Sequence, residues 1–207
     1  MRRAQAGWVA GAAAAVLVAA GAITYAVASD SGSPRVPAAD SADAGFARDM
    51  AVHHQQAVEM SYIVRDRTRD EEVRRLAYDI AQTQANQRGM LLGWLDLWEL
   101  PKVSAKPPMS WMGMGDAPSR GDGSLMPGMA TNDELARLGR LGGREAEVYF
   151  LKLMTEHHKG GVHMAEGCVS ACTVKVEKQL AQGMVEAQQS EIDLMADMLA
   201  ERGAKAG

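Results

Sequence analysis

The chain has 207 residues, of which 47% are hydrophobic and only 5% aromatic, and its formal net charge is −4. This composition favours packed helices over a β-sandwich or barrel. Basic clusters and basic–aromatic interleaving are absent from the sequence, which argues against a nucleic-acid partner, and two cysteines are too few for a disulfide-rich scaffold.

The N-terminal segment differs in composition from the rest of the chain. Arg2 and Arg3 precede an uncharged, largely apolar run from Ala4 to Ser29, which contains an A-x-A cleavage pattern ending at Ala28. The run also reaches the length of about 20 residues that spans a bilayer. We therefore predict that residues 1–28 form either a cleaved signal peptide or an N-terminal transmembrane anchor. In both cases the rest of the chain is exported, and the membrane is a partner only if the segment is uncleaved.

An internal repeat organises the remainder of the chain. The segment Phe46–Met60, FARDMAVHHQQAVEM, returns as Phe150–Met164, FLKLMTEHHKGGVHM, at an offset of 104 positions (150 − 46). Four of the five histidines lie in matched pairs. A repeat of this size predicts two similar supersecondary units, each a helical hairpin that needs the other to bury its apolar face.

The elements follow in order. A Ser/Pro/Gly-rich linker is expected at 29–40. Apolar residues in steps of three and four predict helices at 41–67 and 71–99, the latter ending before Pro101, and these helices form repeat one, 41–100. Residues 101–130 form a loop rich in Met, Gly and Pro.

Repeat two, 131–203, opens with a predicted capping box at Thr131–Glu134 and a short helix that Gly142-Gly143 ends. Helices at about 144–167 and 174–202 follow. The sequence thus predicts an all-α fold, a four-helix bundle of two repeated hairpins over residues 41–203, preceded by the apolar N-terminal segment.

A polar layer is expected inside this bundle. With hairpin turns at about 69 and 172, His53 lies level with Gln84 and Gln87, and His157 lies level with Gln188. Buried polar groups are costly unless they have partners. The layer therefore needs a chemical explanation in both halves.

Methionine flanks the paired histidines in both copies. Thioether and imidazole together suit copper, above all Cu(I), and protons do not block a thioether in an acidic exterior. The alternative is that Met fills helix cores and that each His bonds to a Gln. We predict a copper site whose ligands come from the repeated positions Met50, His53, His54, Met60, Met154, His157, His158 and Met164.

Other residues are candidates for the same chemistry. The Met-rich loop is either a Cu(I) capture strand, with Met126 and Met129 as further ligands and Trp111 beside the cation, or a segment packed over the bundle. His163 is either an extra ligand in repeat two or a surface residue. Zinc or nickel bound by the histidines is a further alternative.

Cys168 and Cys172 fall at the second hairpin turn. In an exported protein a disulfide is the default and would brace this turn, whereas a Cu(I) dithiolate is the alternative. Because a continuous helix would strain the bridge, we expect the helix to end here.

Enzyme motifs are missing from the sequence. Glu-x-x-His, C-x-x-C-H, G-x-S-x-G, the P-loop and H-E-x-x-H are all absent. We therefore do not expect an enzyme.

The paired His-His segments, the Met four residues before and six after the second His, the MPGM motif, and Gln188, Glu191 and Met195 closely resemble the DUF305 family. The resemblance covers about residues 41–202. It implies an exported bacterial protein with a ferritin-like four-helix arrangement, and some members of the family bind copper and are linked to copper tolerance. By position it adds Glu191 and Met195 to the candidate ligands. Gln87 at the position of Glu191, and Gln55-Gln56 in place of a small residue, predict unequal halves.

Together, these features predict an extracytoplasmic metal-binding protein that buffers or chaperones copper, or confers tolerance to it. The alternative is a structural or partner-binding helical module of the cell envelope.

Overall fold

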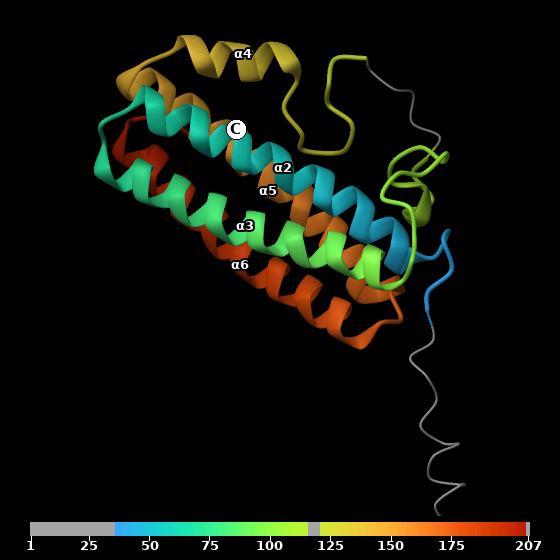
Figure 1. Ribbon diagram of the computed structural model, residues 1–207. Helices are drawn as coiled ribbons and strands as arrows, with labels where there is room; N and C mark the ends of the chain where they lie inside the picture. The colour runs from blue at the N-terminus through green and yellow to red at the C-terminus, as the bar shows by residue number, and fades with distance from the viewer. Residues whose placement is uncertain (1–35, 116–120, 206–207) are drawn as a thin grey trace, which may run out of the picture. The chain divides into compact units, whose positions relative to one another are not determined.

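The computed structural model describes residues 36–115 and 121–205 (Figure 1). The predicted signal peptide or anchor at 1–28, and most of the predicted linker, lie outside these residues. The chain from Pro37 onward forms one compact unit. Among the helices of the described ranges, none combines the length and the apolarity that crossing a membrane requires.

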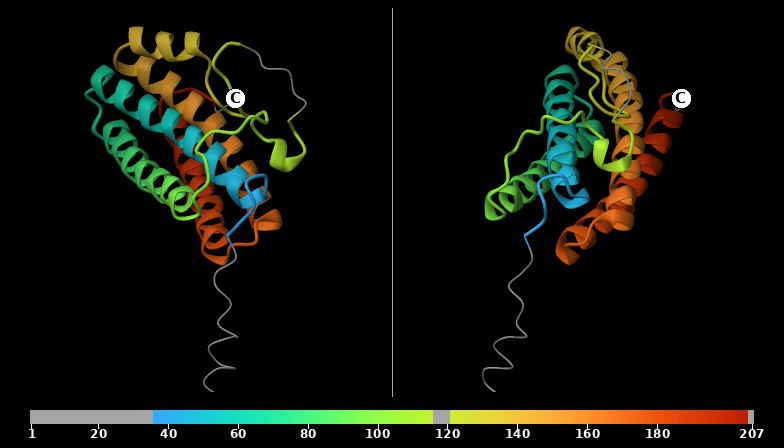
Figure 2. Two further views of the ribbon diagram at one scale, coloured as in Figure 1. Left: turned by 45° about the vertical axis from the view of Figure 1, so that its right-hand side comes forward. Right: turned by 90° about the vertical axis from the view of Figure 1, so that its right-hand side faces the viewer.

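Four long helices make up most of this unit (Figures 1 and 2), namely α2 (Ala42–Arg67), α3 (Glu71–Leu97), α5 (Gly143–Ala171) and α6 (Lys175–Glu201). The shorter helices are η1, a 3₁₀ turn at Ser110–Met112, and α4 (Asn132–Arg140). The regular secondary structure of the described residues is entirely helical, which confirms the all-α prediction.

Local sequence explains the helix starts. The side chains of Ser41 and Asp70 accept hydrogen bonds from the first turns of α2 and α3. Thr131 and Glu134 form the predicted capping box at the start of α4.

The predicted end of the third long helix was wrong. Helix α5 continues past Gly167 to Ala171, with Cys172 as its C-cap. Its glycines serve close packing, because a Cβ at Gly160 would lie 2.1 Å from the carbonyl oxygen of Pro127 and one at Gly161 would lie 2.3 Å from Oε1 of Gln188. These glycines therefore allow neighbouring segments to pack closely against α5, and they do not end the helix.

The two hairpins, α2–α3 and α5–α6, meet mainly through α2 and α5, and α4 lies against both of these helices. Acidic residues at matched positions fasten the hairpin turns of the opposite repeat. Asp43 in α2 accepts hydrogen bonds from the backbone of Thr173 and Val174. Its counterpart 104 positions later, Glu147 in α5, accepts one from Thr68 Oγ1.

Two apolar clusters fill the bundle. We call them the Phe46 cluster, which contains Met50, Met109, Met126, Met164 and Met184, and the Phe150 cluster, which contains Met60, Met154, Met195 and Met198. Six buried polar residues belong to neither cluster and lie between them along all four helices. This histidine layer consists of His53, His54, Gln84, His157, His158 and Gln188.

Candidate metal centre

The histidine layer is built around an approximate twofold relation between the repeats. His53 and His157, which occupy matched positions, lie ring against ring with centroids 3.8 Å apart and planes tilted by 32°. Met50 lies in the same cluster as Met164, and Met60 lies in the same cluster as Met154. Each methionine is therefore grouped with the methionine of the other repeat that does not occupy its matched position. This exchange is what an antiparallel pairing of α2 and α5 about His53 and His157 produces.

His157 has a defined protonation pattern. Its Nε2 lies 3.0 Å from the backbone oxygen of His53. A carbonyl oxygen can only accept, so the proton of the neutral ring sits on Nε2. Nδ1 then carries a lone pair, and this buried atom has no hydrogen-bond partner.

His158 is oriented in the same way by an acidic side chain. Its Nε2 lies 2.7 Å from Oε2 of Glu191, and its buried Nδ1 has no partner. A carboxylate on the far nitrogen is the usual support of a metal-bound imidazole, because it fixes the ring and makes the other nitrogen more basic. Sequence position alone brought Glu191 into the candidate site, and the structure gives it this supporting contact.

The matched contact in the first repeat is weaker. Gln87 lies near His54 and favours its charged form, but neither ring nitrogen of His54 has a partner within hydrogen-bond distance. An amide carries no charge, so it polarises an imidazole less than Glu191 does. The two halves of the layer are therefore chemically unequal.

Burial keeps the imidazoles neutral. It lowers the pKa of His53 to about 3, helped by the nearby His158, and lowers the pKa of His54 to about 3, helped by His53. The pKa of His157 falls well below its usual value, through burial and then through its three histidine neighbours. Neutral imidazole is the form that ligates a metal.

The layer also holds orphaned polar atoms. Both ring nitrogens of His53 and of His54, and the amide atoms of Gln84 and Gln188, are buried without hydrogen-bond partners. Each such group costs about 1–3 kcal/mol when left unpaired. Each neutral imidazole keeps one nitrogen lone pair, and a group of such buried, unpartnered donors fits a bound cation better than it fits core packing.

All eight ligand candidates from the repeat are fully buried on α2 and α5, with none exposing more than a trace of surface. The four methionines divide equally between the two clusters that border the histidine layer. Met50 and Met164 thus lie on one side of the histidine layer, and Met60 and Met154 lie on the other.

The additional candidates take varied positions. His163 is exposed on α5, as expected if it is a surface residue and not an additional ligand. Met195 is buried in the Phe150 cluster, where its sulfur lies 3.9 Å from the hydroxyl of Thr155. Met126 is buried in the Phe46 cluster and Met129 packs against it.

Imidazole and carboxylate donors alone do not complete a ligand set in the layer. Within residues 36–115 and 121–205, three or more His, Cys, Asp or Glu donors converge at only one place, Cys168, Cys172 and Glu177. A metal in the histidine layer would therefore also need sulfur or amide donors, and methionine supplies sulfur on both sides.

The MPGM segment covers the layer. The amide of Gln56 exchanges two hydrogen bonds with the backbone of Ala130, at 2.8 and 2.7 Å, and the Pro127 backbone lies near enough to His53 to raise the pKa of that imidazole against the effect of burial. Gly160, the repeat counterpart of Gln56, lets the Pro127 carbonyl approach α5 closely. Gln56 and Gly160 differ although they occupy matched positions, because both residues contact the same loop segment, from opposite sides.

Replacing Gly160 by Ala is expected to detach this segment. The new Cβ would lie 2.1 Å from the Pro127 oxygen, and backbone atoms would have to move. We expect a loss of about 1–3 kcal/mol in unfolding free energy, the usual cost of overpacking, and faster proteolysis between residues 121 and 131. Gly183→Ala in α6, where a Cβ meets open space, is the matched control and should be neutral or stabilising. Equal behaviour of the two variants would contradict the assignment.

The preceding part of the loop also packs on the bundle. Asp49 accepts hydrogen bonds from the Met109 backbone at 2.7 Å and from Trp111 Nε1 at 2.9 Å. The Trp111 ring lies edge-on to Phe46, with 5.8 Å between centroids, so it serves packing instead of facing the histidine layer. Met114 remains exposed.

The sulfurs of Cys168 and Cys172 are joined in a disulfide. Cys168 lies in the last turn of α5, while Cys172 leaves the helix with ψ of 151°. The bridge therefore spans the end of the helix and does not lie inside it.

Comparisons with known proteins agree with this arrangement. The model of the family described as Domain of unknown function (DUF305) matches residues 43–199. A DUF305 protein from Streptomyces coelicolor, classed as secreted, has 76% sequence identity and a TM-score of 0.77, and the match covers 82% of this chain and 99% of that one. A DUF305 fragment from Deinococcus radiodurans has 29% identity and a TM-score of 0.65, with 77% and 96% covered.

A more distant solved structure is CopM in the Cu(I)-bound form, with 19% identity, a TM-score of 0.56, and 77% of this chain and 96% of that one covered. At this identity the likeness concerns the fold alone. A search of curated proteins gave no match.

The relative described as secreted agrees with the export that the sequence of the N-terminal segment predicts, and the protein is extracytoplasmic. The family model spans all four long helices, and the histidine pairs, the MPGM segment and Glu191 lie within it. The chain belongs to the DUF305 family.

Proposed function

We propose that this protein binds copper, as Cu(I), in its histidine layer and acts outside the cytoplasm as a copper buffer or chaperone. The observation that carries the proposal is the set of buried, unpartnered imidazole nitrogens bordered by buried methionine sulfur on both sides. An apolar core has no use for such lone pairs, whereas Cu(I) prefers this soft donor set.

The chain's own residues would divide the work. His53, His54, His157 and His158 supply imidazole nitrogen, and methionine supplies sulfur that stays available at low pH. Glu191 orients His158, so His158 is expected to be a stronger ligand than its counterpart His54. The segment 126–130, held by Gln56 and Gly160, excludes water from the layer.

Likeness to a fold that has been solved with Cu(I) bound supports copper as the metal, without identifying ligands here. The apolar N-terminal segment would either direct secretion or hold the domain at the membrane surface. The helical domain at 41–203 would be the ferritin-like part that carries the site.

Cu(I) transfer from a chromogenic chelator to the full-length protein tests the proposal. We expect the wild-type protein to withdraw copper from the chelator and His53→Ala/His157→Ala to lose that ability. His163→Ala is the matched control, because this histidine is exposed on the same helix as His157 and should bind normally. Absence of uptake, or undiminished uptake by the double variant, would refute copper binding in the layer.

A second variant separates loss of ligands from loss of folding. Met50→Leu/Met164→Leu conserves core volume and should cost less than about 1.5 kcal/mol per site. It should nonetheless weaken Cu(I) binding. Unchanged Zn²⁺ or Ni²⁺ affinity in this variant, with no Cu(I) uptake by the wild type, would instead favour a histidine-only site.

The rival function, a structural or partner-binding module of the cell envelope, makes a different prediction. Copper bound to the native state at 100 times its dissociation constant should stabilise the protein by about 2.7 kcal/mol. A module in which Met and His only pack would show no such rise in thermal stability.

A further inference from the structure

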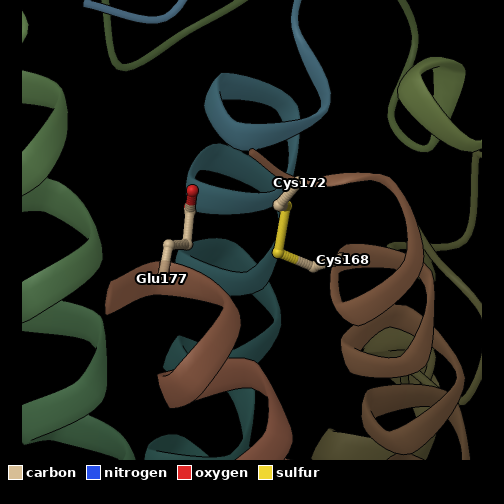
Figure 3. Close-up of side chains that lie close together, drawn as sticks. All are labelled: Cys168, Cys172 and Glu177. Atoms are coloured by element: carbon tan, nitrogen blue, oxygen red, sulfur yellow. A yellow bond between two sulfur atoms is a disulfide. The ribbon is translucent and has the colours of Figure 1, made fainter. Parts of the chain in front are cut away.

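A second group of potential metal donors lies at the turn between α5 and α6, separate from the histidine layer. Figure 3 shows Cys168 and Cys172 at the end of α5 and Glu177 in the first turn of α6. Their donor atoms all lie within 4.8 Å of one another. All three residues are buried, with exposed fractions of 0, 3 and 0%.

Glu177 occupies an unexpected position for an acid. Its counterpart in repeat one is Val73, a fully buried residue of the Phe150 cluster. Both carboxyl oxygens of Glu177 are buried, and no hydrogen-bond donor reaches them. A carboxyl group where the fold elsewhere places valine, with no donor of its own, calls for a functional explanation.

The nearest charged neighbour makes this position still less favourable for a carboxylate. Asp43 already accepts hydrogen bonds from Thr173 and Val174, and it faces Glu177 from α2. Burial, and then the charge of the nearby Asp43 carboxylate, raise the pKa of Glu177 to about 9. A cation beside Glu177 would relieve both the burial and the repulsion.

We propose that reduction of the Cys168–Cys172 disulfide creates a metal site in which the two sulfurs and the Glu177 carboxylate bind Zn²⁺ or a cation of the same borderline class. In the oxidised protein each sulfur is bonded to the other and offers no thiolate. The disulfide therefore prevents metal binding at a site whose donor atoms already lie close together.

The chemistry balances with a dithiol as reductant. The dithiol gives up two electrons and two protons and closes to its own disulfide, while the Cys168–Cys172 bond breaks to two thiols. Zn²⁺ then displaces one proton from each thiol and one from Glu177. Three protons are released per metal bound, and the donors remain on residues that already face one another.

The carboxylate decides the class of metal. Zn²⁺ accepts thiolate sulfur and carboxylate oxygen together, and it fills a four-coordinate sphere with water or a further ligand. Cu(I) prefers sulfur and gains little from a carboxylate. A site built for Cu(I) alone would have no need of Glu177.

Zinc binding by the full-length protein in its two redox states tests the proposal. The protein is reduced with a dithiol, the dithiol is removed without oxygen, and Zn²⁺ is titrated against a chromophoric chelator. We expect one more equivalent of Zn²⁺ in the reduced than in the oxidised protein. Co²⁺ in place of Zn²⁺ should give a thiolate-to-metal charge-transfer band only in the reduced state.

Two variants sharpen the comparison. Cys168→Ser/Cys172→Ser should lose the extra equivalent in both states. Glu177→Gln keeps the shape of the side chain, and we expect it to weaken the extra site by roughly a hundredfold. The comparison of the two redox states uses the wild-type protein only, so its result does not depend on whether a variant folds.

Equal zinc stoichiometry in the two redox states would overturn the proposal. So would an extra equivalent that binds as tightly in Glu177→Gln as in the wild type, because the sulfurs would then act without the carboxylate. The histidine layer is present in both states, and its copper binding stands or falls separately in the Cu(I) assay.

Discussion

Acidification from pH 7 to pH 4 is expected to remove at least about 6 kcal/mol of unfolding free energy from the metal-free Glu177→Gln variant, about 6 through His53 and His54 and more through His157, whose pKa is also lowered. In the native protein the pKa values of His53 and His54 are about 3, against 6.5 in an ordinary setting. Between those values the unfolded chain binds protons that the native state refuses, so stability falls as the pH falls. About 3 kcal/mol per histidine lies between pH 7 and pH 4, and the effect is absent above pH 6.5.

Denaturant unfolding at each pH, with the disulfide intact, measures this loss. The Glu177→Gln background removes one carboxyl group whose titration acts in the opposite direction, and Asp49, whose pKa burial also raises, is the same in every protein compared. Adding His53→Gln/His54→Gln supplies polar side chains that do not titrate, and it should remove the part of the acid-dependent loss that these two histidines cause, while the part due to His157 remains. A background variant as stable at pH 4 as at pH 7 would mean that protons reach the histidine layer freely, and that the layer is neither dry nor closed.

Glu177→Gln is expected to gain stability over the wild type by about 4 kcal/mol more at pH 8 than at pH 5. The pKa of Glu177 is about 9 in the native protein, against 4.5 ordinarily, through burial and then through Asp43. Between those values the native state holds a proton that the unfolded chain has released. Stability contributed by this carboxyl is therefore complete below pH 4.5 and is lost as the pH rises toward 9.

Only the difference between the two proteins matters for this prediction, because the histidines titrate alike in both and cancel. Glu177 is fully buried, so solvent screening leaves most of the effect in place. Glu166→Gln on exposed α5 surface is the matched control and should show no such pH dependence. A constant difference from pH 5 to pH 8 would place Glu177 in contact with water, and would weaken the case for a metal site there.

The periodicity of the sequence was sufficient to predict the helical hairpins, because apolar spacing and helix caps depend on residues that are close together in the chain. The repeat likewise predicted that His53 and His157 lie level with Gln84 and Gln188, since equal hairpins must place equivalent residues at equal heights. Both features depend on local rules applied twice.

The glycines of α5 show where local rules failed. Glycine lowers helix propensity, and the sequence prediction ended the third long helix near Gly167, whereas the helix continues to Ala171. The residues packed against Gly160 and Gly161, namely Pro127 and Gln188, come from a distant loop and from another helix. The close approach that requires glycine therefore exists only after folding.

Glu177 was missed for a related reason, although a sequence signal was available. The acid stands opposite Val73 in the repeat, so comparing the two copies could have identified a polar group at a core position. Its neighbour Asp43 and its place beside the disulfide could not have been inferred, because they depend on how the start of α2 packs against the second hairpin turn.

By itself the sequence determined the all-α repeat and the level of the histidines, because backbone hydrogen bonding and apolar periodicity are local. Only the tertiary structure decided which nitrogens lie buried without partners, how the methionines divide between the two clusters, and that Cys168, Cys172 and Glu177 converge. These properties depend on the antiparallel packing of α2 against α5 and on the closure of each hairpin, which bring together residues that no short-range rule connects.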